Sequence, residues 1–306
     1  MTLKEKLPNI QKNIPLAKYT TLKVGGPAKY FFVAKNKEDL VKGVKAAKRF
    51  KLSLFILGGG SNILIGNKGF KGLVIKNEAR NFEIKNNRII AESGVILNKI
   101  IETVIKAGLM GLEKGSGIPG TLGGAVYGNA GWSKEAWAIG DVVENVELLW
   151  PDGKTEKVGK KWLSFGYRDS RLEKIKSKKP VILEVVLKLR SNFCVAGKLK
   201  KGNRRDLEKR RREILRIRSE KIPPGFSAGS IFKNPPGESA GYLIEKCGLK
   251  GKRIGDAEIS KKHANFIINS GGAKADDVIK LMKLAKQKVK NKFGVLLKEE
   301  IKVINS

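Results

Sequence analysis

Two glycine-rich segments could hold an anionic or flat ligand through the peptide backbone. Residues 58–62 read GGGSN between two short apolar runs, and residues 116–131 contain six glycines, one proline and no charged side chain. Glycine adopts positive φ angles and leaves room where a side chain would stand, so consecutive amides can turn toward a ligand. We therefore predict that both segments line a binding site, where the Ser61 hydroxyl would help to hold a diphosphate.

Two other interpretations exist for residues 116–131. The start of this stretch has the glycine spacing of the dinucleotide-binding fingerprint, but that motif needs a preceding strand and a helix opening inside it. Residues 96–107 have helical periodicity instead, and Pro119 lacks an amide hydrogen. A mobile surface loop would be polar, whereas Ile118 and Leu122 favour burial. The stretch therefore predicts a packed loop that lines a ligand.

Composition excludes several classes of protein. No apolar run approaches the roughly 18 residues that span a membrane, and the N-terminus lacks the hydrophobic core of a signal peptide. We therefore expect a cytoplasmic chain without membrane insertion. Two cysteines far apart and a single histidine indicate neither a disulfide framework nor a metal site.

The net charge of +34 is compatible with two kinds of partner. Basic surfaces bind nucleic acid by releasing counterions, and they also steer small polyanions into clefts. Lysine and arginine are spread along the whole chain, and no nucleic-acid-binding motif occurs. The densest run, residues 198–218, has the pattern of an amphipathic helix with a solvated face. Charge alone does not choose between these partners.

Alternating helices and strands would position the glycine-rich segments. A helix at residues 38–50 and a strand at 54–57 precede the first segment, and a strand at 63–65 follows it. Further elements are expected as hairpins at 82–92 and 142–158, strands at 181–190, 263–269 and 295–304, and helices at 96–107, about 201–218, 239–246 and 276–293. This order predicts an α+β protein with at least two domains.

Five strings occur in order along the chain: GGGSN at 58–62, SGIPGTLGGAVYGNAG at 116–131, YRDS at 167–170, GSIFKNP at 229–235 and the run 240–269. Together they resemble the UDP-N-acetylenolpyruvoylglucosamine reductase family, in its shorter form, over residues 19–302. The resemblance implies an oxidoreductase of peptidoglycan synthesis, and so of cell wall biogenesis, cell shape and cell division. Such a flavoprotein binds FAD, takes hydride from NADPH and reduces UDP-N-acetylglucosamine enolpyruvate to UDP-N-acetylmuramate.

The resemblance also implies a fold. We expect an α+β protein whose two-part FAD-binding domain is of the p-cresol methylhydroxylase and vanillyl-alcohol oxidase type and precedes a C-terminal α+β substrate domain. The expected boundaries are an N-terminal segment at 1–18, a FAD-binding domain at 19–195 with subdomains 19–77 and 78–195, and a substrate-binding domain at 196–306.

The family's catalytic residues match Arg168, Ser230 and Glu300. A guanidinium fork fits the substrate carboxylate, and a serine hydroxyl, although a weak acid, can protonate the strongly basic carbon that hydride addition creates. The glutamate assists at the same carboxylate. Here the chain has LKEEIK where the family usually has Leu-Glu-Pro-Glu-Val-Arg, so Glu299 is the alternative to Glu300. Without the resemblance, Arg168 would be assigned an ion pair with Asp169, and Ser230 a turn or cap.

The remaining binding residues are also implied by the resemblance. FAD is expected to contact the glycine-rich segments at Gly58, Gly59, Gly60, Ser61, Asn62, Gly117, Ile118, Pro119, Gly120, Thr121, Gly123, Gly124, Ala125 and Asn129. The nucleotide and sugar of the substrate are expected at Tyr167, Arg218, Lys221 and Asn234, with a solvated side chain as the alternative for Lys221. His263 is interpreted as structural, and no metal is expected.

Two other classes of function stay open. A different FAD-dependent oxidoreductase of the same fold would explain the glycine-rich segments but not Ser230 or the run 240–269. A basic nucleic-acid-binding protein would explain the charge but not the combination of Arg168, Ser230 and Glu300. We expect a monomer that binds a UDP-sugar and no specific nucleic acid.

Overall fold

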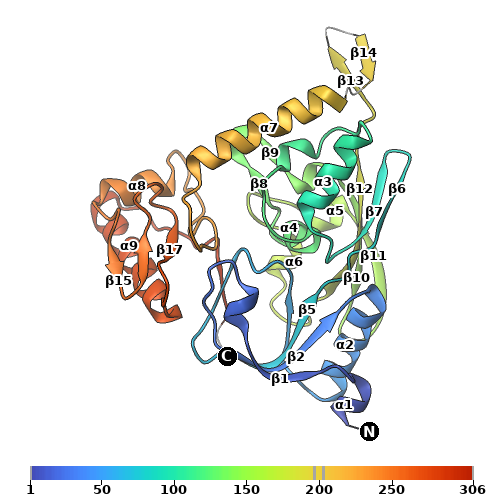
Figure 1. Ribbon diagram of the computed structural model, residues 1–306, viewed down its shortest axis with the longest axis horizontal. Coiled ribbons are helices and arrows are strands. Elements are labelled where there is room, and N and C mark those ends of the chain that lie inside the picture. The colour runs from blue at the N-terminus through green and yellow to red at the C-terminus, as the bar shows by residue number, and fades with distance from the viewer. Residues whose placement is uncertain (1, 196–197, 202–203, 305–306) are drawn as a thin grey trace. The chain divides into compact units, whose positions relative to one another are not determined.

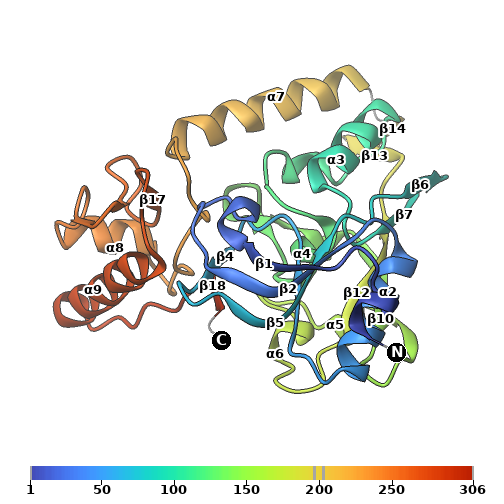
Figure 2. The ribbon, with the colours of Figure 1, turned by 60° about the horizontal axis from the view of Figure 1, so that its bottom comes forward.

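The computed structural model describes residues 2–195, 198–201 and 204–304. They form two compact units. The helices and strands of both are labelled in Figures 1 and 2. The first comprises Met1–Ile10, Phe32–Gly58 and Ile75–Arg218, and the second comprises Gln11–Phe31, Gly59–Val74 and Ser219–Ser306. The chain passes from one unit to the other after Ile10, within β2 (Pro27–Ala34), after Gly58, within β5 (Phe70–Asn77) and near the end of α7 (Arg204–Lys221).

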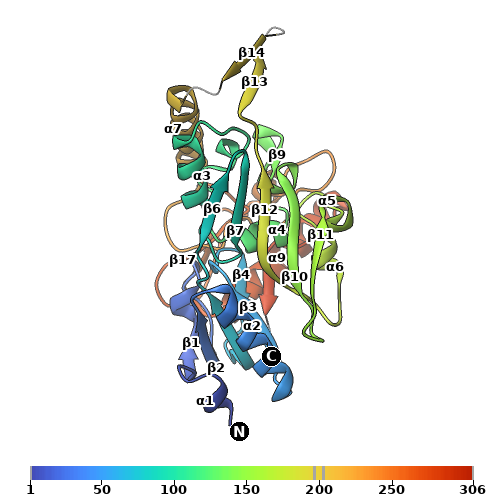
Figure 3. The same cartoon turned by 90° about the vertical axis from the view of Figure 1, so that its right-hand side faces the viewer.

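The first unit is built on a five-stranded antiparallel sheet, which is seen with its strands side by side in Figure 3. The strand order is β11 (Thr155–Gly159), β10 (Val143–Leu149), β12 (Val181–Lys188), β7 (Arg88–Glu92) and β6 (Phe82–Lys85). Helices α3 (Leu97–Lys106) and α4 (Leu122–Tyr127) bury apolar side chains in the same core as the sheet. Helix α3 forms because its apolar residues recur at helical spacing, and it ends before Gly108, whose φ is 69°.

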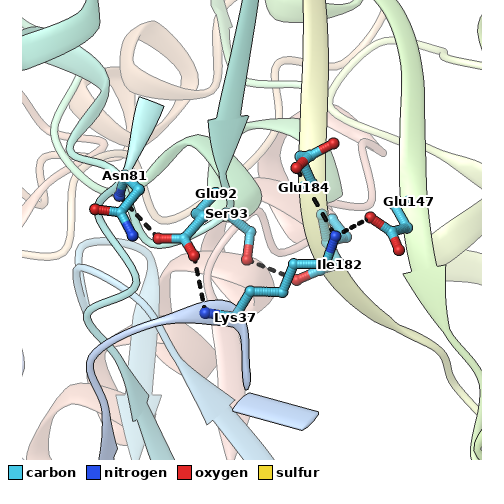
Figure 4. A network of polar contacts seen from close by, with 7 residues as sticks. All are labelled: Lys37, Asn81, Glu92, Ser93, Glu147, Ile182 and Glu184. Atoms are coloured by element: carbon cyan, nitrogen blue, oxygen red, sulfur yellow. Dashed lines mark hydrogen bonds and ion pairs between the residues drawn. The ribbon is translucent and has the colours of Figure 1, made fainter. Parts of the chain in front are cut away.

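Polar contacts tie helix α2 (Lys37–Arg49) to this sheet (Figure 4). The backbone N–H of Lys37 donates to Glu92 Oε1 over 2.8 Å, and the Lys37 ammonium forms ion pairs with Glu147 and Glu184. Burial alone would lower the pKa of Lys37, but the hydrogen bond with Glu147 and the neighbouring carboxylates raise it above its ordinary value. The helix that leads to the first glycine-rich segment is therefore anchored at its N-terminus.

The smaller elements complete the fold. They are α1 (Leu3–Lys6), β1 (Gln11–Pro15), β3 (Leu54–Leu57), β8 (Gly131–Trp132), β9 (Trp137–Ala138), α5 (Lys160–Leu163), α6 (Arg171–Lys174), β13 (Asn192–Val195) and β14 (Lys198–Lys201), with four short 3-10 turns at Leu16–Tyr19, Glu113–Gly115, Ser133–Glu135 and Ile139–Asp141. A second sheet has the order β1-β2-β5-β3. The predicted strand at 54–57 is confirmed at both ends.

Helix α7 begins at Arg204, later than the predicted start at about residue 201, because Lys198–Lys201 pairs with Asn192–Val195 as a hairpin. This run is so rich in lysine and arginine that the spacing of its apolar residues could not distinguish a strand from a helix. Within the first unit, Leu207 and Ile214 of α7 are buried, and Arg211 Nη2 donates to Glu102 Oε1 of α3 over 2.6 Å. The predicted domain boundary after residue 195 adjoins residues 196–197, which lie outside the described part of the chain.

Besides β1 and parts of β2 and β5, the second unit combines two helices with short strands. They are α8 (Ala240–Lys246), α9 (Ala275–Phe293), the antiparallel sheet β15 (Arg253–Ile254), β16 (Ala257–Ile259) and β17 (Ile267–Asn269), and the parallel pair β18 (Lys302–Ile304) and β4 (Ile63–Ile65). Helix α9 buries the predicted apolar stripe, including Val278, Leu281 and Val289. The expected strands at 263–269 and 295–304 were too long, since only their last three residues pair regularly.

The α+β class is confirmed by this mixture of sheets and helices. The domain boundaries stay predictions. Among the described residues, no helix is long and apolar enough to cross a membrane.

Candidate functional site

The first unit brings parts of the two glycine-rich segments together. A Cβ built on Gly58 would lie 2.5 Å from Thr121 Oγ1, so only glycine permits this approach. Thr121 caps α4, which the sequence had not predicted inside residues 116–131. The loop nevertheless packs as expected, because Ile118 and Leu122 are buried. Lys76 Nζ donates to the Gly58 carbonyl, and burial lowers the pKa of Lys76.

Glycines of the second segment serve different purposes. A Cβ on Gly123 would lie 2.8 Å from Ser93 Cβ, and one on Gly117 would lie 2.9 Å from Arg218 Nε. A Cβ on Gly124 would meet only Thr121 Oγ1, at the ordinary contact distance of 3.5 Å. Gly123 is therefore required for packing, whereas Gly124 borders space that a flat ring or a diphosphate could occupy.

Arg168 lies on a strained turn in the first unit. Its φ is 52°, a left-handed conformation that an L-residue adopts at a cost of about 1–3 kcal/mol and that clusters at functional sites. A Cβ on Gly131 would lie 2.9 Å from Arg168 Nη1, so this glycine leaves room for the guanidinium. Asn129 Nδ2 donates to the Gly166 carbonyl over 2.7 Å, which holds the start of the turn. The alternative partner Asp169 forms an ion pair with Lys174, at 2.7 Å.

Arg218 adds a second guanidinium to the first unit. It stacks over Trp132 with 5.5 Å between Cζ and the ring centroid, and its Nη2 donates to the Gly117 carbonyl over 3.2 Å. Its Nε is buried without a hydrogen-bond partner among the described residues. Burial, and then the charge of Arg168, lower the pKa of Arg218. Two nearby guanidinium groups, one of them buried, make this part of the first unit positively charged and suited to an anion.

The rest of the first glycine-rich segment belongs to the second unit. Gly60 has φ 66°, and a Cβ there would lie 2.1 Å from the Tyr19 carbonyl oxygen. Asn62 Nδ2 donates to the Glu300 carbonyl over 3.2 Å, and the Asn62 carbonyl accepts from Lys302 N–H over 3.0 Å. A Cβ on Gly229 would lie 3.9 Å from the Ser61 carbonyl oxygen. The turn therefore adjoins the segments that carry Ser230 and Glu300.

Ser230 and Glu300 lie on neighbouring segments of the second unit. The backbone N–H of Glu300 donates to the Ile231 carbonyl over 2.8 Å, directly after Ser230. The neighbouring residue Glu299 forms an ion pair with Lys286 of α9 at 2.7 Å. Burial would raise the pKa of Glu299, but this hydrogen bond and the Lys286 charge lower it. Glu299 thus has an ion-pair partner on α9, and the backbone of Glu300 is hydrogen-bonded to the residue after Ser230.

The other predicted substrate residues are more exposed. Tyr167 is exposed and lies 5.5 Å from the Arg168 guanidinium, measured to its ring centroid. Asn234 Oδ1 accepts from Ala240 N–H at the start of α8 over 3.1 Å, and Lys221 is exposed. Lys221 also contributes a charge that lowers the pKa of His263, after the larger effect of burial.

Sequence reasoning missed Lys76, Trp132 and Asn265. Trp132 directly follows the glycine-rich stretch, which was a usable signal. Lys76 gives no local signal, because its contact with Gly58 depends on the pairing of distant strands. Asn265 lies inside the run 240–269 that carried the resemblance, yet its contacts with Phe232 span 33 residues.

Two family models match the chain. The model described as FAD binding domain matches residues 28–159, and the model described as UDP-N-acetylenolpyruvoylglucosamine reductase, C-terminal domain, matches residues 222–304. This order confirms the expected FAD-binding domain followed by a C-terminal α+β domain, and FAD as the cofactor.

Similar proteins cover nearly the whole chain. UDP-N-acetylenolpyruvoylglucosamine reductase of Caldicellulosiruptor bescii is 42% identical over 99% of this chain and 93% of its own length. A protein of the same name from Bacillus cereus, numbered 1, is 38% identical over 95% of this chain and 93% of its own length. The crystal structure of UDP-N-acetylenolpyruvylglucosamine reductase from Thermus caldophilus matches with a TM-score of 0.78 and 34% identity, over 96% of this chain and 98% of that one. The chain therefore belongs to the UDP-N-acetylenolpyruvoylglucosamine reductase family.

Proposed function

We propose that the protein reduces the enolpyruvyl ether of UDP-N-acetylglucosamine enolpyruvate to UDP-N-acetylmuramate in peptidoglycan synthesis, with NADPH as the reductant. The observation that carries this proposal is the position of Ser230 beside Glu300 in the second unit. A hydrogen bond of 2.8 Å joins Glu300 N–H to the carbonyl of Ile231, the residue after Ser230. A hydroxyl and a carboxyl group on adjoining segments suit a carbanion-like centre next to a carboxylate.

The residues of the first unit fit FAD. A Cβ on Gly124 would find space, and Gly58 packs against Thr121 where no larger residue fits. The Lys76 ammonium is half-buried and holds the Gly58 carbonyl, which orients the start of the GGGSN turn. FAD, when bound, accepts hydride from NADPH and supplies it to the methylene carbon of the substrate. We assign the fourteen residues predicted above from Gly58 to Asn129 to its binding.

The chain's own residues manage charge and protons. Arg168 holds the substrate carboxylate in its guanidinium fork, where negative charge gathers after hydride addition. Ser230 gives its hydroxyl proton to the carbon beside that carboxylate, which is basic enough to take a proton from a serine. Glu300 assists at the same carboxylate, and its neighbour Glu299 is engaged by Lys286.

Four residues are proposed to bind the nucleotide and sugar. Arg218 has a buried Nε without a partner among the described residues and stacks on Trp132, so it is suited to an anionic group. Lys221, Asn234 and Tyr167 are exposed, as residues that meet a large substrate would be. Of these four residues, Arg218 is therefore proposed to bind an anionic group most strongly.

One purified sample tests the proposed function. We expect a yellow protein whose flavin absorbance is bleached by NADPH and restored by the enolpyruvyl substrate. A colourless protein would favour a nucleic-acid-binding role. Bleaching without reoxidation by this substrate would favour another FAD-dependent oxidoreductase of the same fold.

The cytoplasmic location and the monomeric state remain proposals, which fractionation of cells and light scattering test. The positive charge is proposed to attract small anions, so substrate binding should weaken with salt. Tight sequence-selective binding of DNA or RNA at about 0.15 M salt would overturn this part of the proposal.

A further inference from the structure

No regular strand holds the segment that carries Ser230. Ser230 pairs with Phe266, and Phe232 pairs with Glu299, as isolated bridges outside the named strands. Gly229, directly before the serine, has φ 76°. A proton donor needs a fixed position, because a misplacement of about 1 Å can cost about 100-fold in rate. Other contacts must therefore fix this segment.

Besides backbone hydrogen bonds from this segment to residues 298–301, Asn265 supplies three contacts. Its Nδ2 donates to the Phe232 carbonyl over 2.8 Å, and its Oδ1 accepts from Phe232 N–H over 2.9 Å. Its backbone carbonyl accepts from Ile231 N–H over 2.8 Å. The side-chain amide thus bonds both polar groups of one residue, as a hydrogen-bonded pair in an antiparallel ladder does. Asn265 is 3% exposed, so these hydrogen bonds are shielded from water.

The same contacts reach Glu300. The Ile231 carbonyl accepts from Glu300 N–H over 2.8 Å, while the Ile231 N–H is held by Asn265. Asn265 is itself fixed, because its N–H donates to His263 Nδ1 over 3.2 Å. A displacement of Asn265 would therefore move Ile231 and, with it, both the segment of Ser230 and the backbone of Glu300.

We propose that Asn265 is a positioning residue for proton transfer: by fixing Ile231 and Phe232, it sets the positions of Ser230 and Glu300. This inference rests on the proposed function, in which Ser230 gives its proton to the substrate carbon. Asn265 acts through the peptide backbone and does not touch the substrate.

The first test compares two buried asparagines in the FAD-loaded protein. Asn269 is also 3% exposed, and its amide bonds the backbone of Leu22, Gly271 and Ala273 instead of the Ser230 segment. We expect both Asn265→Ala and Asn269→Ala to lower the urea midpoint. Only Asn265→Ala should slow reoxidation of the flavin by the enolpyruvyl substrate, by about 10-fold to 100-fold, with reduction by NADPH and substrate KM close to normal.

Asn265→Asp provides a second readout if the alanine variant does not fold. One carboxylate oxygen can still accept from Phe232 N–H, but the other faces the Phe232 carbonyl and repels it unless it is protonated. Burial and this carbonyl raise the pKa of the new carboxyl group. The variant should therefore recover reoxidation rate as the pH falls, relative to the wild type. A pH profile parallel to the wild type would contradict the positioning role.

A double variant separates failure of this inference from failure of the proposed function. If Asn265 acts through Ser230, adding Asn265→Ala to Ser230→Ala should slow reoxidation little further. Full multiplication of the two effects, or equal slowing by Asn269→Ala and Asn265→Ala, would refute the positioning role of Asn265. If Ser230→Ala alone leaves reoxidation unchanged, the proposed proton donor is wrong, whatever Asn265 does.

Discussion

The two units fix their candidate ligand residues by different means. In the first unit, a five-stranded sheet and its core hold a glycine-rich stretch whose backbone lines the proposed FAD site. In the second unit, strands β15 to β18 of the C-terminal part are two or three residues long, and Ser230 and Glu300 lie outside them. There, the buried side-chain amides of Asn265 and Asn269 make hydrogen bonds to the backbone that longer strands would otherwise make.

This difference predicts whether a substitution will prevent flavin binding or impair one half-reaction. When the backbone lines a site, replacing a glycine by a larger residue fills the space that the ligand needs, and binding is lost. When side chains on irregular segments form the site, substitution of one of them can impair a single chemical step while the backbone of the site stays in place. Bulk at the glycines of residues 117–124 should therefore remove the flavin, whereas substitutions at Ser230 and Glu300 should leave it bound and impair one half-reaction.

The largest effect is expected from Gly124→Val. A Cβ at this position meets only Thr121 Oγ1 at 3.5 Å, so the chain should fold while the added bulk occupies the space proposed for FAD. The purified variant should be colourless, as measured by flavin absorbance against protein concentration. Gly159→Val is the matched control, since its Cβ would meet only the Glu144 carbonyl oxygen at 3.9 Å, and it should stay yellow. Full flavin occupancy in Gly124→Val would show that the cofactor lies elsewhere.

The next effect is expected from Ser230→Ala in the second unit. The hydroxyl has no task while NADPH reduces the flavin, so flavin content and reduction should stay close to normal. Reoxidation by the enolpyruvyl substrate should slow by roughly 100-fold to 10,000-fold, the usual contribution of a positioned general acid. Stopped-flow absorbance measures each half-reaction. Slow reduction with normal reoxidation would make the turn-forming interpretation of Ser230 the better one and would remove the contrast between the units.

A smaller effect distinguishes two adjacent glutamates. Glu300→Gln should slow reoxidation by about 10-fold or more, because the carboxyl group proposed to assist at the substrate carboxylate is replaced by an amide. Glu299→Gln should change it little and lower stability by less than about 1 kcal/mol, because the Glu299–Lys286 pair is 39% exposed on both sides. Steady-state kinetics and urea unfolding test the pair. The opposite ranking would mean that Glu299 faces the substrate.

The smallest effect concerns the only histidine of the sequence. Burial, then the charges of Lys221 and Lys250, lower the pKa of His263 below 6.5, against the opposing charge of Glu245. The folded state therefore binds this proton less readily than the unfolded state does. The stability contribution is full above the pKa of the unfolded state and is lost as the pH falls from that value through the lower pKa of the folded state.

This histidine can be tested by urea unfolding at two pH values. The urea midpoint should fall more between about pH 7.5 and about pH 5.5 in the wild type than in His263→Gln, because glutamine takes up no proton. Equal falls would mean that His263 is not the group responsible.

Local patterns in the sequence determined much of this protein. Apolar residues at helical spacing located α3 and α9, and five strings in order indicated the family, because both signals depend on residues close together in the chain. The same periodicity misjudged the region near residue 201, where a dense run of basic residues carries no apolar signal. Residues 122–127 were also missed as a helix, since glycine disfavours helices in isolation, whereas here the Thr121 cap and burial in the core stabilise one.

The tertiary structure alone decided which distant groups meet. It brings Gly58 against Thr121, stacks Arg218 on Trp132, pairs Glu299 with Lys286 and places Asn265 against Phe232. Each contact joins residues with no periodic relation in the sequence, so no local pattern could indicate it. The sequence determined which chemical groups the protein owns, and long-range packing decided which of them are desolvated, partnered or held in place, because burial and hydrogen bonding depend on the whole fold.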